Sequence, residues 1–503
     1  MSAHLVWLRN DLRLHDHAPL AEAARAAAAD GAELAVVYVA DPRLAEPTRW
    51  GPPKQGAHWH RFRAEALADL RESLRAVGSD LIVRTGRPEA EVPELVRAVG
   101  AGTVWLHDEP MPEEQDVEAA LRAALPDGVR VEVRWGFTLL HPADLPFEIA
   151  DAPDGFSSFR RKVEGKPKKG KPAVPVRDEI ALPEALPPPP ALDAGEIPGP
   201  EAFGLDTPPA SPRATGDFPG GETAALARLQ TYVWDRDRLR VYKETRNGML
   251  GPDDASRLSP YFAHGCLSPR RVHSEVKRYE AERVANESTY WLIFELLWRD
   301  HFRFYGAKHG ANLFAPGGPQ NRDIDWPWHR PVVEAWRRAE TGIPIVDANL
   351  RELAETGYMS NRGRQNVASF FAKTLRQDWR GGAAWFETKL LDYDVTSNWG
   401  NWAYVSGVGA DPRDRWFDVV GQSRRYDPDG EYLRHWLPEL ADVPTAHLHA
   451  PGDAPTSVLQ RSGITLGAQY PAPIAEVTPP ERSRKQARRQ NDGRRRRDGR
   501  RSR

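Results

Sequence analysis

Short apolar runs alternate with amphipathic segments along the first 135 residues. The apolar runs predict β-strands at residues 5–8, 34–39, 81–84, 103–107 and 129–134. The amphipathic segments between them predict helices at residues 18–29, 59–77, 89–99 and 113–125. Regular alternation of strand and helix predicts an α/β domain over residues 1–135 with a parallel, doubly wound sheet. No G-x-G-x-x-G motif follows the first strand, so the NAD fingerprint is missing.

Proline changes the character of the chain after residue 135. Residues 136–218 include four consecutive prolines and a lysine-rich run, and proline at this density disfavours helices and central strands. We expect a long interdomain linker here, with a short helix at residues 155–164. Residues 219–440 then predict an all-α domain, and residues 441–503 an irregular, basic tail. The predicted helices of the second domain span residues 223–243, 269–282, 289–305, 331–341, 349–356, 363–375 and 383–393.

Composition limits the class of protein. The chain has 503 residues, 40% hydrophobic and 28% charged, which excludes a fibrous or mostly disordered protein and predicts at least two domains. A single cysteine, Cys266, excludes an internal disulfide and a cysteine metal cluster. No apolar stretch approaches the ~20 residues of a membrane span, and the start lacks a secretory signal, so we expect a cytoplasmic protein.

The net charge of −2 conceals a basic end. Residues 482–503 hold twelve Lys or Arg against two Asp and contain almost no apolar side chain, which predicts a disordered arm. Attraction to nucleic acid and a solubility tail are equally good explanations of this charge.

An acidic side chain stands inside an apolar helix of the second domain. Glu295, Trp298 and Arg299 share one helical face. A buried carboxylate either pairs or does chemistry at a shifted pKa, so a Glu295–Arg299 ion pair and a cavity for a planar ring are both open interpretations. Asp392 and Asp394 lack a third ligand at useful spacing, so no metal is expected.

Several ordered motifs between residues 4 and 440 resemble the photolyase/cryptochrome family. They are WLRNDLR at residues 7–13, SRLSP at 256–260, GCLSP at 265–269, ELLWRD at 295–300, NRGRQN at 361–366 and DYD at 392–394. The DASH branch is indicated by LPF at residues 145–147 with Phe159, Arg160 and Lys162, by TRNGM at 245–249 and by NWGNW at 398–402.

The resemblance implies an antenna domain, a linker and a helical domain that holds FAD in a bent conformation. Arg364 and Asp394 would form an ion pair facing the isoalloxazine, and Asn398 would present its amide to flavin N5. Tyr242 and residues 255–259 would hold the phosphates. The implied FAD contacts are Tyr242, Ala255, Ser256, Arg257, Leu258, Ser259, Arg299, Asn361, Arg364, Asp392, Tyr393, Asp394 and Asn398.

The implied reaction is light-driven splitting of cyclobutane pyrimidine dimers by an electron from reduced flavin, with single-stranded DNA favoured. Glu295 would hydrogen-bond the dimer, Asn361 would contact its base edge and Trp298 would stack on it. The residues implied to border the DNA are Arg246, Arg362 and Tyr404, and those implied to relay electrons inward are Trp402, Trp379 and Trp326.

The resemblance also implies a second chromophore in the first domain. Glu109 would contact methenyltetrahydrofolate, although flavin or deazaflavin antennas occur in the wider family. We expect a monomer. Two other functions stay open: a photoreceptor or regulator that binds FAD and nucleic acid without repair, and, ranked last, a flavoprotein electron carrier.

Overall fold

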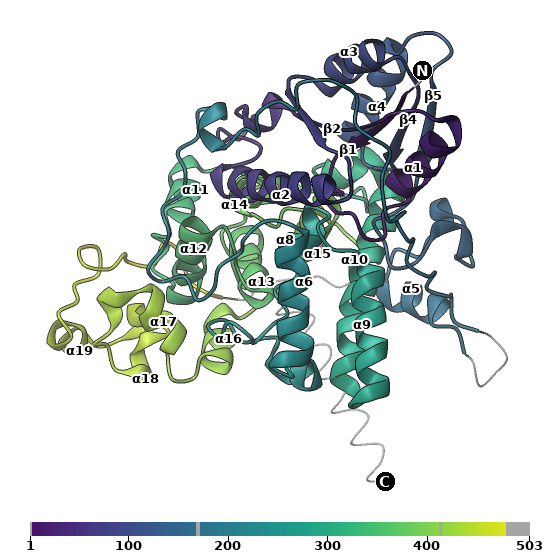
Figure 1. The fold of residues 1–503 in the computed structure, drawn as a ribbon. Coiled ribbons are helices and arrows are strands. Elements are labelled where there is room, and N and C mark those ends of the chain that lie inside the picture. The colour runs from purple at the N-terminus through teal and green to yellow at the C-terminus, as the bar shows by residue number, and fades with distance from the viewer. Residues whose placement is uncertain (1–2, 167–171, 412–414, 479–503) are drawn as a thin grey trace.

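The computed structural model describes residues 3–166, 172–411 and 415–478 (Figure 1). Its first domain is a parallel sheet of five strands in the order β3-β2-β1-β4-β5. This order confirms the predicted doubly wound α/β domain. The strands are β1 (Ala3–Leu8), β2 (Leu34–Ala40), β3 (Leu81–Thr85), β4 (Ala101–His107) and β5 (Arg130–Arg134).

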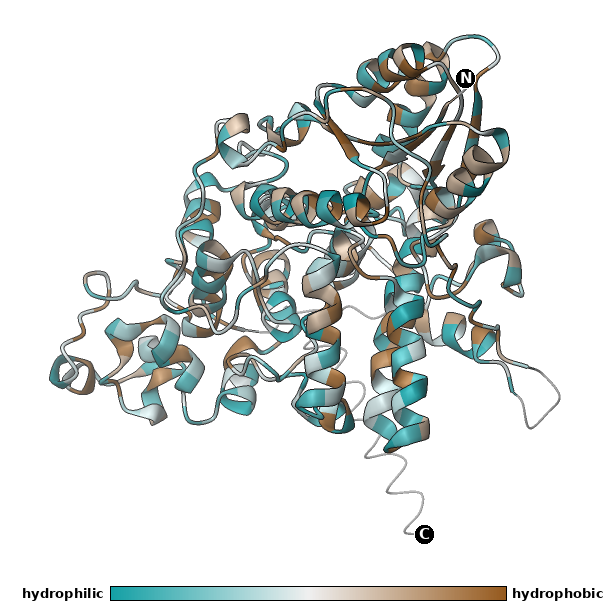
Figure 2. Cartoon of the chain, in the orientation of Figure 1, coloured by the Kyte–Doolittle hydropathy of each residue, from teal (hydrophilic) through white to brown (hydrophobic). Residues whose placement is uncertain are grey.

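Helices cover both faces of the sheet because its central strands are apolar on both sides. Every side chain of β1 and β2 is buried. Val6 and Val36 pack with α1 (Ala18–Asp30) and α2 (Ala57–Ala76). Leu5 and Val37 point the other way, toward α3 (Pro88–Val99) and α4 (Pro112–Ala124). Figure 2 shows the apolar strands and the helices on the two faces of the sheet.

The linker wraps around the α/β domain. Backbone hydrogen bonds join Leu34 N to Pro188 O (3.0 Å) and Val83 N to Ala194 O (2.8 Å). The short helix expected near residue 160 is α5 (Phe156–Val163). Residues 167–171, which hold most of the lysine-rich run, lie outside the described residues.

The second domain is helical, as predicted. One predicted helix, residues 223–243, is wrong: α6 (Glu222–Gln230) passes into a π-helical turn and the chain then bends at Asp237, whose φ is 52°. Left-handed backbone ends a regular helix. The principal helices that follow are α7 (Tyr242–Thr245), α8 (Ser259–Ala263), α9 (Pro269–Glu282), α10 (Glu287–His309), α11 (Arg330–Arg337), α12 (Pro344–Thr356), α13 (Asn361–Ser369), α14 (Trp379–Lys389), α15 (Val395–Ser406), α16 (Val419–Tyr426) and α17 (Glu431–Trp436).

Helix α15 has no counterpart among the predicted helices. Its sequence contains β-branched residues, asparagine and Gly400, which lower helix propensity. Packing overrides that preference: a Cβ on Gly400 would lie 2.4 Å from the ring of Phe302, so glycine lets α15 approach α10 closely. The N-cap is Asp394, which accepts a hydrogen bond from Ser397 N.

The chain stays folded beyond residue 440. Leu448, Leu459 and Tyr470 are buried in the core of the helical domain, and two short helices, α18 (Thr445–Leu448) and α19 (Thr456–Arg461), lie in this segment. The Tyr470 hydroxyl donates to the buried Asp347 carboxylate at 2.7 Å. The basic arm from residue 482, predicted to be disordered, lies outside the described residues.

The motif GCLSP joins the two domains. Gly265 has a φ of 69°, and a Cβ there would lie 1.8 Å from Asn10 O, so this position requires glycine. The buried Arg13 guanidinium donates to Gly265 O at 2.9 Å. The carboxyl end of β1 is thereby fixed against the helical domain. No helix of the described residues is long and apolar enough to cross a membrane.

Candidate flavin site

A cavity of about 220 Å³ opens among α13, α14 and α15. Clefts for small-molecule ligands begin at about this size. Apolar walls come from Phe386 and Val405, and polar groups converge from Asn361 and Ser397. The lining residues are Ser259, Tyr358, Met359, Asn361, Arg364, Gln365, Ala368, Phe386, Leu390, Asp392, Tyr393, Asp394, Ser397, Asn398, Asn401, Trp402 and Val405.

Arg364 forms the ion pair of the cavity with Asp392, not with Asp394 as expected. Its NH2 lies 2.7 Å and 3.0 Å from the two Asp392 oxygens. Burial lowers the pKa of Arg364, but the Asp392 carboxylate outweighs this effect and holds the pKa above its usual value. Asp394 is directed elsewhere because it caps α15, accepting from Ser397 N and Thr396 Oγ1 at 2.8 Å each.

Asn398 presents an amide oxygen to the cavity. Its Nδ2 donates to Ala383 O on α14 at 3.0 Å, and this bond fixes the orientation of the amide. Because the nitrogen is engaged with the backbone, Oδ1 is the atom left to accept from a ligand. A planar heterocycle with an N–H edge suits this acceptor and the neighbouring Arg364–Asp392 pair.

Glu295 and Trp298 lie beside the cavity rather than in its wall. Arg246 NH1 is 2.8 Å from Glu295 Oε1, so the expected partner Arg299 is not the one observed. Burial raises the pKa of Glu295, although Arg246 opposes the shift. Trp298 stacks on Phe156 of α5 at 3.7 Å and meets Tyr404 edge-on at 6.2 Å. Tyr404 directly precedes Val405, which lines the cavity, and so connects Glu295 and Trp298 with the residues of the cavity wall.

Several other residues predicted to contact FAD do not line the cavity. The described residues that line the cavity include Ser259 but not Tyr242, residues 255–258 or Arg299. The carbonyls of Ala255 and Ser256 accept from Arg228 at 3.2 and 2.9 Å, and Arg299 donates to Phe137 O. Tyr242 is buried against Tyr232.

Of the three tryptophans predicted to relay electrons, two lie together and the third lies apart from them. Trp326 Nε1 and Trp379 Nε1 donate to the same oxygen, Pro316 O, at 3.0 and 3.1 Å, which brings these two indoles together. Trp402 lines the cavity, but among the described residues no ring contact joins it to Trp379. Trp379 instead contacts Trp399 at 5.8 Å.

Glu109 lies buried between the two domains. Asn10 Nδ2 donates to Oε1 at 3.0 Å, and Arg303 NH2 donates to Oε2 at 2.5 Å. Arg303 NH1 is also 3.8 Å from Asp394 Oδ2. Burial raises the pKa of Asp394, but Arg299 and Arg303 overcome this and lower it. Arg303 was not among the predicted site residues, although it lies on the same face of α10 as Arg299, one helical turn later.

Arg362, the third residue expected beside DNA, lies between the helical elements. Its NH2 donates to Asn247 Oδ1 at 2.9 Å, and its guanidinium lies over Tyr426 at 4.5 Å.

Comparisons with known proteins agree with this arrangement. The family model described as DNA photolyase matches residues 4–178, and that of the FAD binding domain of DNA photolyase matches residues 291–490. Cryptochrome DASH of Natronomonas pharaonis is 49% identical over 478 residues, which cover 95% of this chain and 98% of that protein. The chain belongs to the DASH branch of the photolyase/cryptochrome family.

Solved structures of this family share the fold. A cryptochrome from Synechocystis sp. PCC6803 is 48% identical, with a TM-score of 0.90 over 95% of this chain and 97% of that chain. An archaeal photolyase from Sulfolobus tokodaii, described with two FAD molecules, is 25% identical with a TM-score of 0.72 over 94% and 96%. As a DASH family member with the FAD binding domain, the chain is a flavoprotein, and the cavity beside Arg364 and Asn398 fits a flavin.

Proposed function

We propose that this protein uses blue light to split cyclobutane pyrimidine dimers, with preference for single-stranded DNA. The observation that supports it is the Arg246–Glu295 pair, which stands with Trp298 and Tyr404 beside the cavity that we assign to the flavin. A carboxyl group, an indole and a phenol together offer hydrogen bonds and stacking to an extruded pyrimidine dimer. A structural ion pair alone would not need these aromatic neighbours.

Bound FAD supplies the electron that the reaction needs. Arg364, Asp392 and Asn398 orient the ring, with Asn398 Oδ1 as the acceptor for its N–H edge. A protonated Glu295 donates a hydrogen bond to a pyrimidine carbonyl, and an ionised Glu295 accepts one from a pyrimidine N–H. Burial raises the pKa of Glu295, which favours a protonated, donating carboxyl once DNA displaces Arg246.

The preference for single strands follows from the cost of base extrusion. Flipping a dimer from a duplex costs a few kcal/mol, and a single strand avoids most of it. Arg246 and Arg362 already hold protein partners, Glu295 and Asn247, so they offer limited compensation for opening a duplex.

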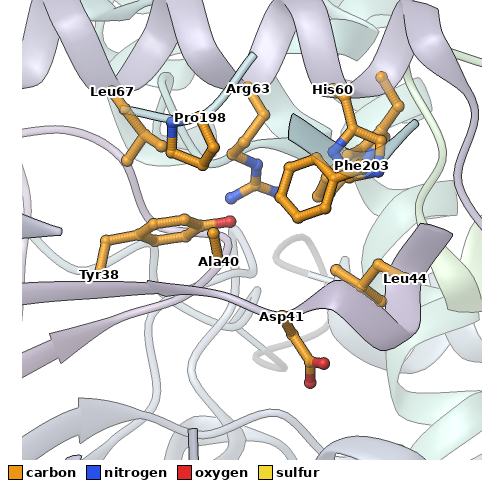
Figure 3. Close-up of a pocket in the computed structure, with 10 residues that line it drawn as sticks. Tyr38, Ala40, Asp41, Leu44, His60, Arg63, Leu67, Pro198 and Phe203 are labelled. Atoms are coloured by element: carbon orange, nitrogen blue, oxygen red, sulfur yellow. The ribbon is translucent and has the colours of Figure 1, made fainter. Parts of the chain in front are cut away.

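We propose a folate antenna at the domain boundary. Both Glu109 oxygens are engaged, but Glu114 Oε2 and Glu387 Oε1 are buried acceptors without a hydrogen-bond partner among the described residues. Such acceptors suit the N–H and amino groups of a pterin ring. The hollow at the end of β2, into which Arg63 and Phe203 project (Figure 3), holds about 10 Å³, room for about one water molecule, and is too small for a pterin.

The deciding experiment measures dimer repair directly. Chemically reduced protein of recorded absorption spectrum is illuminated with thymine dimers in single-stranded and double-stranded oligonucleotides. Repair of the single strand, with a weaker effect on the duplex, supports the proposal, and an additional near-ultraviolet band supports the folate. Failure on both substrates with FAD bound would favour the alternative, a photoreceptor that binds nucleic acid. The cytoplasmic location and the monomeric state stay predictions.

A further inference from the structure

Aromatic rings connect Trp402 to the protein surface along a path that does not use Trp379. The ring of Trp402 lies 6.4 Å from that of Trp336 and 6.0 Å from that of Phe371. Trp336 and Phe371 are 4.4 Å apart, and Phe371 lies 6.5 Å from Trp328. Trp328 in turn lies 4.9 Å from Trp50, in the loop before α2. The series begins at the cavity and ends at the surface.

Two adjacent glycines of α14 allow this packing. A Cβ on Gly382 would lie 2.4 Å from the Trp402 ring, and a Cβ on Gly381 would lie 2.2 Å from the Trp328 ring. Trp402 and Trp328 therefore contact neighbouring residues of α14. Any larger side chain at either position would push an indole away.

The indole N–H groups differ between the two ends of the path. Nε1 of Trp402 and of Trp336 is buried without a hydrogen-bond partner among the described residues. An oxidised indole there has no acceptor for its proton, so it stays a cation and can be reduced again by the next indole. Trp328 is 37% exposed, and water can accept its proton.

Neighbouring charges leave the outer end available for oxidation. Arg337 lies 5.8 Å from the ring of Trp328, Arg49 and Arg380 lie 4.8 and 5.8 Å from that of Trp50, and a cation beside an indole disfavours its oxidation. Arg337 is paired with Glu334 at 3.0 Å and Arg380 with Asp378 at 2.6 Å, however, and Arg49 is exposed to solvent. Solvent screens what is left of their charge.

We propose that Trp336 and Trp328 form a second route by which electrons reach Trp402 during light-driven flavin reduction. The oxidant is the bound, light-excited flavin, so the inference rests on the proposed function. Trp402 loses one electron. Trp336 then gives an electron to Trp402 through direct ring contact, and Trp328 gives an electron to Trp336 across Phe371. Oxidised Trp328 releases its indole proton to water. A thiol in the medium returns one electron and one proton and becomes a thiyl radical, and two such radicals combine into a disulfide.

The test compares single and double variants of the FAD-loaded protein. Trp379→Phe and Trp328→Phe should each slow photoreduction by about twofold, and together by at least about tenfold, because each removes one of two parallel routes. Trp385→Phe is the matched control, since Trp385 is a partly exposed indole of the same region that contacts Arg337 but none of the relay rings. Trp336→Phe should behave like Trp328→Phe.

A spectroscopic measurement separates this inference from the repair function. Transient absorption should detect a deprotonated tryptophan radical in Trp379→Phe, and this signal should disappear when Trp328→Phe is added. Loss of all photoreduction in Trp379→Phe alone, or an unchanged radical in the double variant, would overturn the second route. Wild-type protein that is photoreduced but repairs no dimer would instead contradict the repair proposal.

Discussion

Two hollows of the molecule differ in size and in what their side chains already bind. The cavity of the helical domain, about 220 Å³, is lined by Asn398 and the Arg364–Asp392 pair. The hollow of the α/β domain, about 10 Å³, contains Arg63, whose guanidinium donates to Arg9 O and Asn10 Oδ1 at 2.5 and 2.6 Å. The same guanidinium lies over Trp59 at 4.5 Å.

The difference shows that position in a fold does not by itself make a ligand site. Parallel sheets place sites at the carboxyl ends of strands, and the hollow at β2 occupies such a place. Its space of about 10 Å³ admits no more than about one water molecule, however, and the Arg63 guanidinium is held by Arg9 O and Asn10 Oδ1. His60 Nε2 and Arg63 Nε have no hydrogen-bond partner among the described residues, and burial lowers the pKa of His60 to about 4, which keeps it neutral. In the helical domain the polar groups are oriented but leave atoms free for a ligand. The predictions that follow test this contrast.

The largest effect is expected from Asp392→Ala. Loss of a charged hydrogen-bond partner costs about 1.5–3 kcal/mol, so FAD affinity should fall by about tenfold to somewhat more than a hundredfold. The flavin content of the purified protein and titration with FAD measure this. Glu439→Ala removes the carboxylate of another Arg ion pair, that of Arg351, remote from the cavity lining, and should keep normal flavin content. Equal flavin loss in both variants would contradict the assignment of the cavity as the FAD site.

Glu295→Ala should separate substrate chemistry from flavin binding. We expect repair of a dimer to fall by about tenfold to a hundredfold, since a hydrogen bond to a developing charge is removed, while FAD stays bound. The quantum yield of repair and the flavin spectrum measure the two effects. Glu287→Ala, on the same helix with a side chain 80% exposed, is the control. An unchanged quantum yield would remove Glu295 from the reaction.

The sequence predicted the α/β domain better than the site. All five strands and their helices lie within a few residues of the predicted bounds, because alternation of strand and helix is a local signal. The Arg364–Asp392 pair and the Arg246–Glu295 pair depend on side-chain direction between distant segments, and the sequence paired neither correctly. Phe156 was outside every motif, and only tertiary packing shows that it covers Trp298.

Arg63→Ala should have a moderate effect confined to the α/β domain. Removing the guanidinium leaves Asn10 Oδ1 and Arg9 O without its hydrogen bonds, which should lower the free energy of unfolding by about 1–3 kcal/mol. Flavin content should not change, because Arg63 lies outside the helical cavity. Urea denaturation and the flavin spectrum measure these quantities. Flavin loss equal to that of Asp392→Ala would break the contrast between the two hollows.

The smallest effect is expected from deletion of residues 482–503. The described residues that line the two hollows do not extend beyond Val405, so flavin content and repair at low salt should equal those of the full chain. If the arm binds phosphates, its removal should flatten the salt dependence of single-stranded DNA binding, by about 0.7 in the log–log slope for each phosphate that the arm neutralises. Binding titrations over a range of salt concentrations measure the slope. An unchanged slope would assign the arm to solubility and leave recognition of DNA to the folded residues.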